Sequence, residues 1–228
     1  MRLRLKLYPA MLLLLFACCG CFSVEYQTEI NRRGGGTRTV EIVMDPMMAG
    51  LYNKSSVSEK LFNIPGQGLQ AKNGVVLAGS SKAELDDGSL KLSWRYRTGR
   101  AELFSDGADS LKLNIARAGL WVYYEYREII PASQPEKSQP SSGQNIYRIR
   151  HKLAMPGQVI SHNADSILSG SLIWNRPLGQ VTDVGLVMEA RSRELNPIYI
   201  LLALFLLLAG VSLLYRHKSR LMNNKNIA

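Results

Sequence analysis

The sequence has little cysteine and little histidine for a chain of 228 residues. All three cysteines, Cys18, Cys19 and Cys21, lie near the N-terminus, so they cannot join distant parts of the chain by disulfides. The three histidines are remote from this cluster, and cysteines this close together cannot build a good four-ligand zinc cage alone. We therefore expect no metal site and no cofactor, and a domain that depends on its own hydrophobic core.

Motifs of catalytic sites are also lacking: the sequence contains no GxSxG, no HExxH and no Walker loop. Two weaker patterns remain. "RRGGGTR" (residues 32–38) could cradle a phosphate with glycine N–H groups, but it lacks the strand–loop–helix context, and a hairpin tip is favoured. "ELDDGS" (residues 84–89) could touch a cation, but it lacks the calcium-loop spacing, and a turn is favoured. We expect no catalytic residues and a protein that is not an enzyme.

The net charge of +10 comes mainly from the two ends of the chain. Seven bases and no acids stand there: Arg2, Arg4, Lys6, Arg216, Lys218, Arg220 and Lys225. Without these seven, 21 of the 28 basic residues remain against 18 acidic residues, which leaves only +3 for the middle. A nucleic-acid partner is therefore not expected.

Residues 1–20 have the pattern of a bacterial lipoprotein signal peptide: a basic start, then an apolar run from Met11 to Ala17 that is too short to cross a bilayer. A cysteine after such a run is the site of diacylglyceryl attachment. Cys21 is favoured because Gly20 precedes it and the strand-like "FSVEYQTEI" follows it. Cys18 stays open as the alternative. Membrane lipid is thus an expected covalent partner.

The C-terminal segment contains a long uncharged run, from Asn196 to Tyr215, followed at once by basic residues. This pattern predicts one transmembrane helix over residues 195–215, with residues 216–228 as a basic cytoplasmic tail. We therefore expect a cell-membrane location, with residues 21–194 forming an extracytoplasmic domain that is anchored at both ends.

Period-two alternation dominates residues 21–194, and "SLKLSWRYR" places Leu90, Leu92, Trp94 and Tyr96 on one face. A first β-hairpin is expected with Gly34–Gly36 at its turn, followed by a helix that Asp45 caps and Pro46 opens. "GLWVYYEYREII" is aromatic on both faces, which predicts a central strand covered on both sides. The predicted fold class is α+β: an antiparallel, sheet-rich domain with a short helical insertion, plus the C-terminal transmembrane helix.

The segment "MPGQVISHNADSILSGSLIWNRPLG" resembles bacterial envelope lipoproteins of the LppM-domain type. The matching positions are Pro156, Gly157, Val159, Asn163 and Trp174. The resemblance implies an envelope protein with an α+β domain and a role at lipids, and it implies no catalytic residues. From the residues alone, Pro156–Gly157 is a turn, His151 is an inward-facing core histidine, and Trp174 belongs to the core.

Two functions are compatible with these patterns. The first is a lipid- or glycolipid-binding envelope module, with an apolar pocket of several hundred cubic ångströms walled by Met47 and Met48. The second is a tethered interaction or assembly protein that presents a sheet face to another envelope protein, with a solid core and an exposed apolar patch. Outward basic residues either meet anionic headgroups or form an ordinary solvated face. These are Lys91, Arg95, Arg97, Arg148, Arg150 and Lys152.

Overall fold

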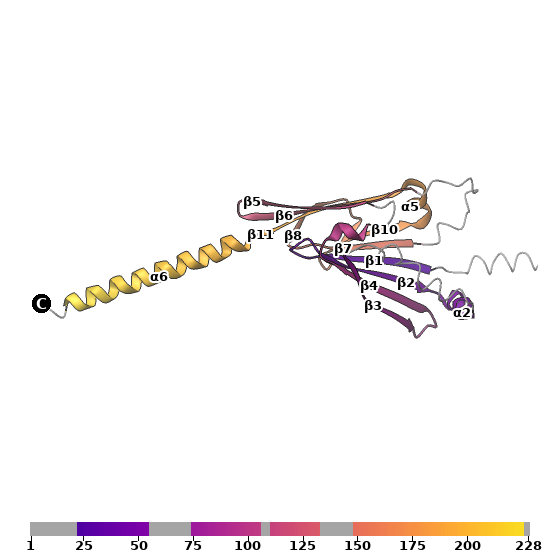
Figure 1. Cartoon of the computed structure of the whole chain (residues 1–228), viewed down its shortest axis with the longest axis horizontal. Coiled ribbons are helices and arrows are strands. Elements are labelled where there is room, and N and C mark those ends of the chain that lie inside the picture. The colour runs from indigo at the N-terminus through magenta and orange to yellow at the C-terminus, as the bar shows by residue number, and fades with distance from the viewer. Residues whose placement is uncertain (1–21, 55–73, 106–109, 133–147, 226–228) are drawn as a thin grey trace, which may run out of the picture.

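The computed structural model describes residues 22–54, 74–105, 110–132 and 148–225, which form two β-sheets and few helices (Figure 1). The expected α+β class is therefore wrong, because this part of the chain is mostly β-sheet. The segment 1–20 and the predicted lipidation site Cys21 lie outside the described residues, so lipid attachment stays a prediction.

The larger sheet has seven strands in the order β3-β4-β2-β1-β7-β10-β9. Their bounds are β1 (Phe22–Ile30), β2 (Gly36–Met44), β3 (Val75–Glu84), β4 (Leu90–Thr98), β7 (Arg148–Ala154), β9 (Ser166–Leu168) and β10 (Ser171–Pro177). Neighbours run antiparallel except β1 and β7, which are parallel. The predicted first hairpin is confirmed as β1–β2, and Gly34 adopts a φ of 83° in its turn, a conformation that favours glycine.

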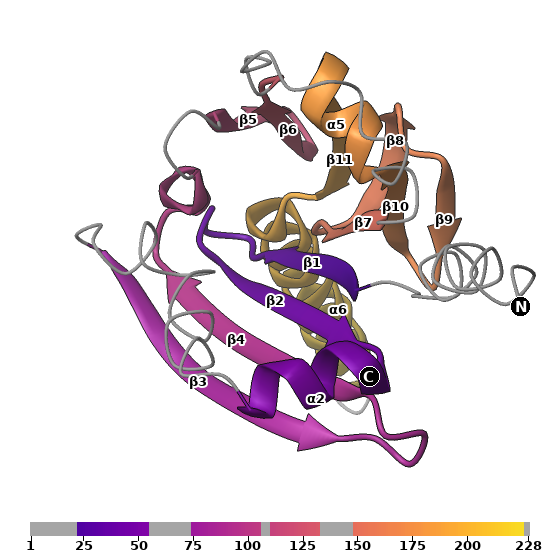
Figure 2. The ribbon, with the colours of Figure 1, turned by 90° about the vertical axis from the view of Figure 1, so that its right-hand side faces the viewer.

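The smaller sheet has four antiparallel strands in the order β5-β6-β11-β8. These are β5 (Ser110–Ala118), β6 (Trp121–Ile130), β8 (Gln158–His162) and β11 (Leu186–Leu195). A 3₁₀ turn, η3 (Ala101–Phe104), follows β4 before the chain enters the smaller sheet. In Figure 2, β5, β6 and β11 lie across from the curved larger sheet. Alternation in the sequence indicates that a strand is half-buried, but not which sheet it joins, and this is why two sheets were not foreseen.

The hydrophobic core fills the space between the sheets. Leu92, Trp94 and Tyr96 of β4 are buried, which confirms the predicted inward face of that strand. Tyr126 of β6 and Met188 of β11 enter the same core from the smaller sheet. The prediction that β6 is covered on both sides is wrong: its outward residues at 125 and 127 are exposed, while its even-numbered residues from 122 to 128 are buried.

The Pro156–Gly157 turn carries the chain from β7 in the larger sheet to β8 in the smaller one. Gly157 has a φ of 76°, and a Cβ atom there would lie 2.2 Å from the carbonyl oxygen of Arg193. Only glycine permits this close approach of the corner to β11. The predicted turn is confirmed, and its position shows that it helps hold the two sheets together.

Three helices complete the described structure: α2 (Pro46–Lys54), α5 (Leu178–Val184) and α6 (Pro197–Lys225). The predicted start of α2 is confirmed, because the backbone N–H of Met48 donates to Asp45 Oδ1 at 2.8 Å. Short α5 follows β10 directly, and α6 continues from β11 and extends away from both sheets (Figure 1).

The expected C-terminal transmembrane helix is corrected by the structure. Within the described residues, no helix is both long and apolar enough to cross a membrane. The single-pass location with a cytoplasmic C-terminus, which rested on that helix, is overturned with it.

Candidate functional site

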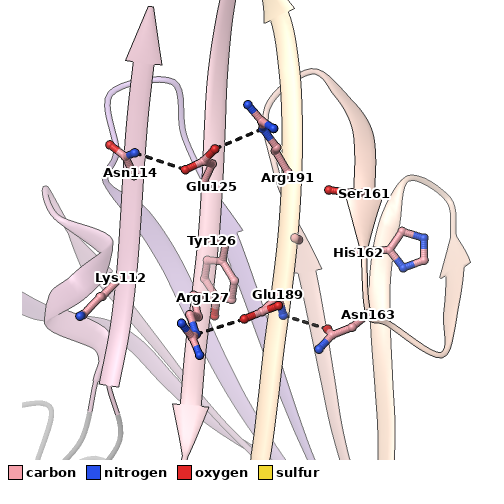
Figure 3. A pocket seen from close by; sticks show the side chains of 11 residues that line it. Lys112, Asn114, Glu125, Tyr126, Arg127, Ser161, His162, Asn163, Glu189 and Arg191 are labelled. Carbon is pink, nitrogen blue, oxygen red and sulfur yellow. Dashed lines mark hydrogen bonds and ion pairs between the residues drawn. The ribbon is translucent and has the colours of Figure 1, made fainter.

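The outer face of the four-stranded sheet contains a groove of about 510 Å³ (Figure 3). Because successive strand residues point to opposite faces, the burial of Tyr126 and Met188 turns their neighbours on β6 and β11 outward. The groove is lined largely by polar and charged side chains of all four strands: Lys112, Asn114, Glu125, Arg127, Ser161, His162, Asn163, Glu189 and Arg191.

Two ion pairs cross the groove floor between β6 and β11. Arg127 Nε lies 3.1 Å from Glu189 Oε1, and Arg191 Nε lies 3.2 Å from Glu125 Oε1. Both pairs follow from strand register, which sets Glu189 opposite Arg127 and Arg191 opposite Glu125. Each carboxylate is thus balanced by an arginine of the facing strand (Figure 3).

Lys112 on β5 completes the charge of the groove. It lies opposite Arg127 in register, and it forms no ion pair with any described residue. The lining therefore carries three cationic side chains against the two carboxylates, which leaves one positive charge. A groove of this composition attracts an anion and offers hydroxyl, amide and carboxylate partners to a hydroxyl-bearing molecule.

His162 and Asn163 at the end of β8 form one wall of the groove (Figure 3). The backbone N–H of Ala164 donates to His162 Nδ1 at 3.1 Å, so a neutral ring carries its proton on Nε2 and can donate it. Asn163 Oδ1 accepts from the indole N–H of Trp174 at 2.9 Å and from the backbone N–H of Glu189 at 2.8 Å. Asn163 therefore fixes the wall by joining β10 of the larger sheet to β11 of the smaller.

Beyond the groove, arginines stack on aromatic rings along the same outer face. The guanidinium carbon of Arg191 lies 4.9 Å from the centre of the Tyr123 ring, and that of Arg193 lies 4.5 Å from the centre of the Trp121 ring. Such contacts hold an arginine plane in a defined orientation while its edge stays free for hydrogen bonds.

A second cluster of ionisable side chains lies buried between the two sheets. Arg38 of β2 lies 2.9 Å from Glu128 of β6, and their side chains are only 5% and 2% exposed. Arg38 also donates to Thr28 Oγ1 at 2.9 Å and to the carbonyl of Phe104 at 3.1 Å, while the Tyr126 hydroxyl donates to Glu128. These bonds satisfy both buried charges and connect the sheets.

Burial and pairing shift the pKa values of this cluster. Burial opposes ionisation of Glu128, but Arg38, His151 and the Tyr126 hydrogen bond together hold the pKa of Glu128 below its ordinary value. Burial lowers the pKa of His151 to about 4 against the attraction of Glu128, and Arg38 lowers it further. His151 stacks on Tyr26 with ring centres 4.7 Å apart, and its buried Nε2 has no hydrogen-bond partner among the described residues. The cluster is enclosed, so we assign it to stability.

The glycine-rich hairpin tip does not cradle a phosphate. The backbone N–H groups of Arg33 and Gly35 donate to Asn31 Oδ1 at 2.9 and 3.2 Å, and that of Gly34 donates to the Asn31 carbonyl at 3.0 Å. The turn therefore uses the donors that a phosphate would need. A groove of about 680 Å³ borders this tip, but Arg32 there is already paired with Glu194 at 2.9 Å.

The other residues that the sequence indicated lie in a turn, in the core or on the surface outside the grooves. Asp87 Oδ1 accepts from the backbone N–H of Ser89 at 2.9 Å within a turn, and no described group of three or more His, Cys, Asp and Glu could hold a metal. His151 and Trp174 are buried core residues as predicted. Met47 and Met48 are exposed and line neither of the two grooves described above.

Three of the six basic residues that were expected to face outward on the larger sheet form ion pairs with described residues. Lys91 lies 2.8 Å from Glu41, and Lys152 and Arg150 lie 2.8 and 3.8 Å from Glu25.

The groove residues of the smaller sheet were missed by the sequence reasoning. The signal that could have found them is shared by "YYEYRE" and "MEARSRE": each has an outward glutamate two residues before an outward arginine, and antiparallel pairing then sets each acid opposite a base.

Comparisons with known proteins add little. No protein-family model matches the chain, and no curated protein matches it. Among solved structures, the chain is similar to the NMR structure of the folded domain of Mycobacterium tuberculosis LppM. The two are 18% identical with a TM-score of 0.38, over 77% of this chain and 91% of that one. The predicted resemblance thus extends to a solved domain only as a distant likeness.

Proposed function

We propose that this protein is a non-enzymatic binding module whose groove on the outer face of the four-stranded sheet holds an anionic, hydroxyl-bearing headgroup, such as that of a glycolipid. The observation that carries the proposal is the groove itself: its volume of about 510 Å³ suits a small ligand, and most of its lining residues are polar or charged, with one excess positive charge. Lys112, which lacks a carboxylate partner among the described residues, supplies that charge.

The ion pairs and polar side chains of the groove favour a headgroup over an acyl chain. An acyl chain gains its binding energy from apolar surface, whereas this groove is crossed by the Arg127–Glu189 and Arg191–Glu125 ion pairs. Sugar hydroxyls can both donate to the carboxylates and accept from the Asn114 amide and the His162 ring. The apolar pocket walled by Met47 and Met48 is therefore not part of this proposal.

The test is calorimetric titration of the full chain with three matched probes: glucose 1-phosphate, glucose and inorganic phosphate. We expect glucose 1-phosphate to bind more tightly than either probe that contains only half of its chemistry. Lys112→Gln should weaken the binding of glucose 1-phosphate about tenfold, since a hydrogen bond to a charged group contributes about 1.5 kcal/mol. The matched control is Arg95→Gln, which removes an exposed charge from the larger sheet.

Equal binding of all three probes, or equal loss in Lys112→Gln and Arg95→Gln, would contradict the proposal. To separate a lipid source from a soluble one, the same titration uses mixed micelles that contain phosphatidylglycerol and, in parallel, free glycerophosphoglycerol. Tighter binding to the micelles would identify a lipid headgroup as the natural source of this chemistry, and equal binding would favour a soluble ligand.

An interaction or assembly function is favoured by a different observation. At the junction of the smaller sheet with α6, Leu120, Leu195 and Ile198 are 55%, 50% and 63% exposed. Exposed apolar side chains that lie close together mark many protein–protein contact sites. Crosslinking from a photoreactive residue at position 120 tests this candidate function. The absence of any crosslink to another protein would contradict it.

A further inference from the structure

Arg193 stands apart from the other cations on the outer face of the four-stranded sheet because its row holds no acid. Strand register places Tyr123 of β6 and Gln158 of β8 beside it. By contrast, the rows of Arg191 and Arg127 each include a glutamate that pairs with the arginine. No described hydrogen bond or ion pair reaches the Arg193 guanidinium, and its Nε atom is buried without an acceptor.

A buried N–H group without an acceptor is costly, by about 1–3 kcal/mol in typical proteins, and asks for an explanation. The Trp121 ring, 4.5 Å from the guanidinium carbon, stabilises the positive charge through its face but accepts no strong hydrogen bond. Because the Nε atom is covered, the two Nη groups are the donors of Arg193 that can reach an acceptor outside the described chain.

The backbone of β11 fixes the position of this arginine. The Pro156–Gly157 corner packs directly on it: a Cβ atom at Gly157 would lie 2.2 Å from the Arg193 carbonyl oxygen. The neighbouring Ser192 hydroxyl donates to the Pro156 carbonyl at 2.7 Å. Arg193 is thus held from below by the corner and from the side by Trp121, which is the preorganisation that an anion receptor needs.

Arg193 also lies next to the groove. It follows Arg191 by two positions on the same strand, so its Cα atom is roughly 7 Å further along the outer face. Arg191 itself lines the groove. A ligand that occupies the groove can therefore extend one of its groups to Arg193 without leaving the sheet surface.

We propose that Arg193, stacked on Trp121, binds the phosphate group of the ligand through two parallel N–H···O bonds, while the groove binds the hydroxyl-bearing part. This inference rests on the proposed function and names the chemical class of its ligand as a phosphorylated sugar or polyol. A planar guanidinium matches a phosphate in this two-bond geometry, which a lysine ammonium cannot reproduce.

Replacement by lysine is the sharpest test because it keeps the charge and removes the planar fork. In calorimetric titrations of the full chain, Arg193→Lys should lower the affinity for glucose 1-phosphate at least tenfold and leave the weaker binding of glucose unchanged. Arg95→Lys, which makes the same replacement on the larger sheet, should change neither. Thermal unfolding of each variant shows whether the fold is intact.

Trp121 gives a second variant and a direct signal. Trp94 and Trp174 are 3% and 1% exposed in the core, whereas Trp121 is half-buried on the outer face, so a ligand at Arg193 should change chiefly the fluorescence of Trp121. Trp121→Leu should abolish this signal and lower the affinity for glucose 1-phosphate severalfold, because Arg193 loses the ring on which its guanidinium stacks.

The outcomes separate the inference from the proposed function. Wild-type affinity for glucose 1-phosphate in folded Arg193→Lys, with the loss in Lys112→Gln preserved, would overturn the role of Arg193 and leave the groove proposal standing. Failure of the wild-type chain to bind any of the probes would overturn both. Selective loss of phosphate-dependent binding in Arg193→Lys supports the inference.

Discussion

Glu128 and Glu125 lie on the same strand, β6, but they face opposite sides of the four-stranded sheet. The Glu128 side chain is 2% exposed and is paired with Arg38 across the core, whereas the Glu125 side chain is 46% exposed and is paired with Arg191 on the surface. Both carboxylates contact an arginine at about hydrogen-bond distance. The two pairs differ in their access to water. The inner pair is shielded from water and connects the two sheets, whereas the outer pair is solvated and can exchange its partners for a ligand.

Removal of Glu128 should have the largest effect on stability. Glu128→Ala leaves the Arg38 charge buried without a counter-ion, and we expect the free energy of unfolding to fall by about 3–5 kcal/mol. Glu125→Ala on the same strand should cost less than about 1 kcal/mol, because the exposed Arg191 is then solvated by water. Urea unfolding of the two variants measures both values, and similar losses would contradict the contrast between the faces.

The second-largest effect should come from acid, which protonates the buried His151 on the inner side of the larger sheet and lowers stability. His151 has an ordinary pKa of 6.5 and a pKa of about 4 in the fold, so the unfolded chain binds the proton more tightly. Stability contributed by neutral His151 is therefore complete above pH 6.5 and is lost as the pH falls to about 4. This loss is on the order of 3 kcal/mol at 1.36 kcal/mol for each pH unit.

His151→Phe separates this effect from other acid titrations. Phenylalanine keeps a ring against Tyr26 but cannot take a proton, so unfolding free energies measured between pH 6.5 and pH 4 should become flatter in the variant. The Glu128 contribution remains in the variant and disappears only as the pH falls through the lowered pKa of Glu128. An unchanged slope between pH 6.5 and pH 4 would show that His151 is not the titrating group.

A smaller effect is expected at the wall that joins the two sheets beside the groove. Asn163→Ala removes acceptors for the Trp174 indole and the Glu189 backbone N–H, and we expect a loss of about 1–2 kcal/mol. The variant should also have a lower affinity for glucose 1-phosphate, since Asn163 lines the groove. Asn175→Ala, an exposed change on β10, is the control. A folded Asn163→Ala with wild-type stability and affinity would contradict the assigned bridge.

The smallest effect should come from the outer face of the larger sheet, where Lys91 is paired with Glu41 at 2.8 Å. Lys91→Gln should change stability by less than about 1 kcal/mol and should not change ligand affinity, because this pair lies on the surface of the other sheet. A loss of affinity in Lys91→Gln as large as that in Lys112→Gln would remove the distinction between the two outer faces.

Local patterns in the sequence were enough to predict several elements. The β1–β2 hairpin, the Asp45 cap of α2 and the inward face of β4 depend on residues close in sequence, and the structure confirms them. The inward charges were also readable: Arg38 shares its strand face with Val40, and Glu128 shares its face with Tyr126. Period-two alternation places each of them inside, although Arg38 was considered only as part of the glycine-rich tip.

The groove could not be predicted in the same way. The β5–β6 hairpin is local, but β6, β11 and β8 are brought together by long-range register, which the alternation of a single strand does not encode. The lack of an acid beside Arg193 is visible only when Tyr123 and Gln158 are known to be its neighbours. The division into two sheets likewise depends on the turns at η3 and Gly157, whose directions the sequence pattern leaves open.

The most direct test of the account is an NMR titration of the full, ¹⁵N-labelled chain with glucose 1-phosphate. We predict that the shifted amide signals cluster on the outward-facing residues of β6 and β11, from Arg127 and Glu189 to Trp121 and Arg193, and that signals of the larger sheet stay unchanged. Saturable shifts confined to the larger sheet or to the β1–β2 hairpin tip, or no shifts at all, would contradict the assignment of the binding site to the four-stranded sheet.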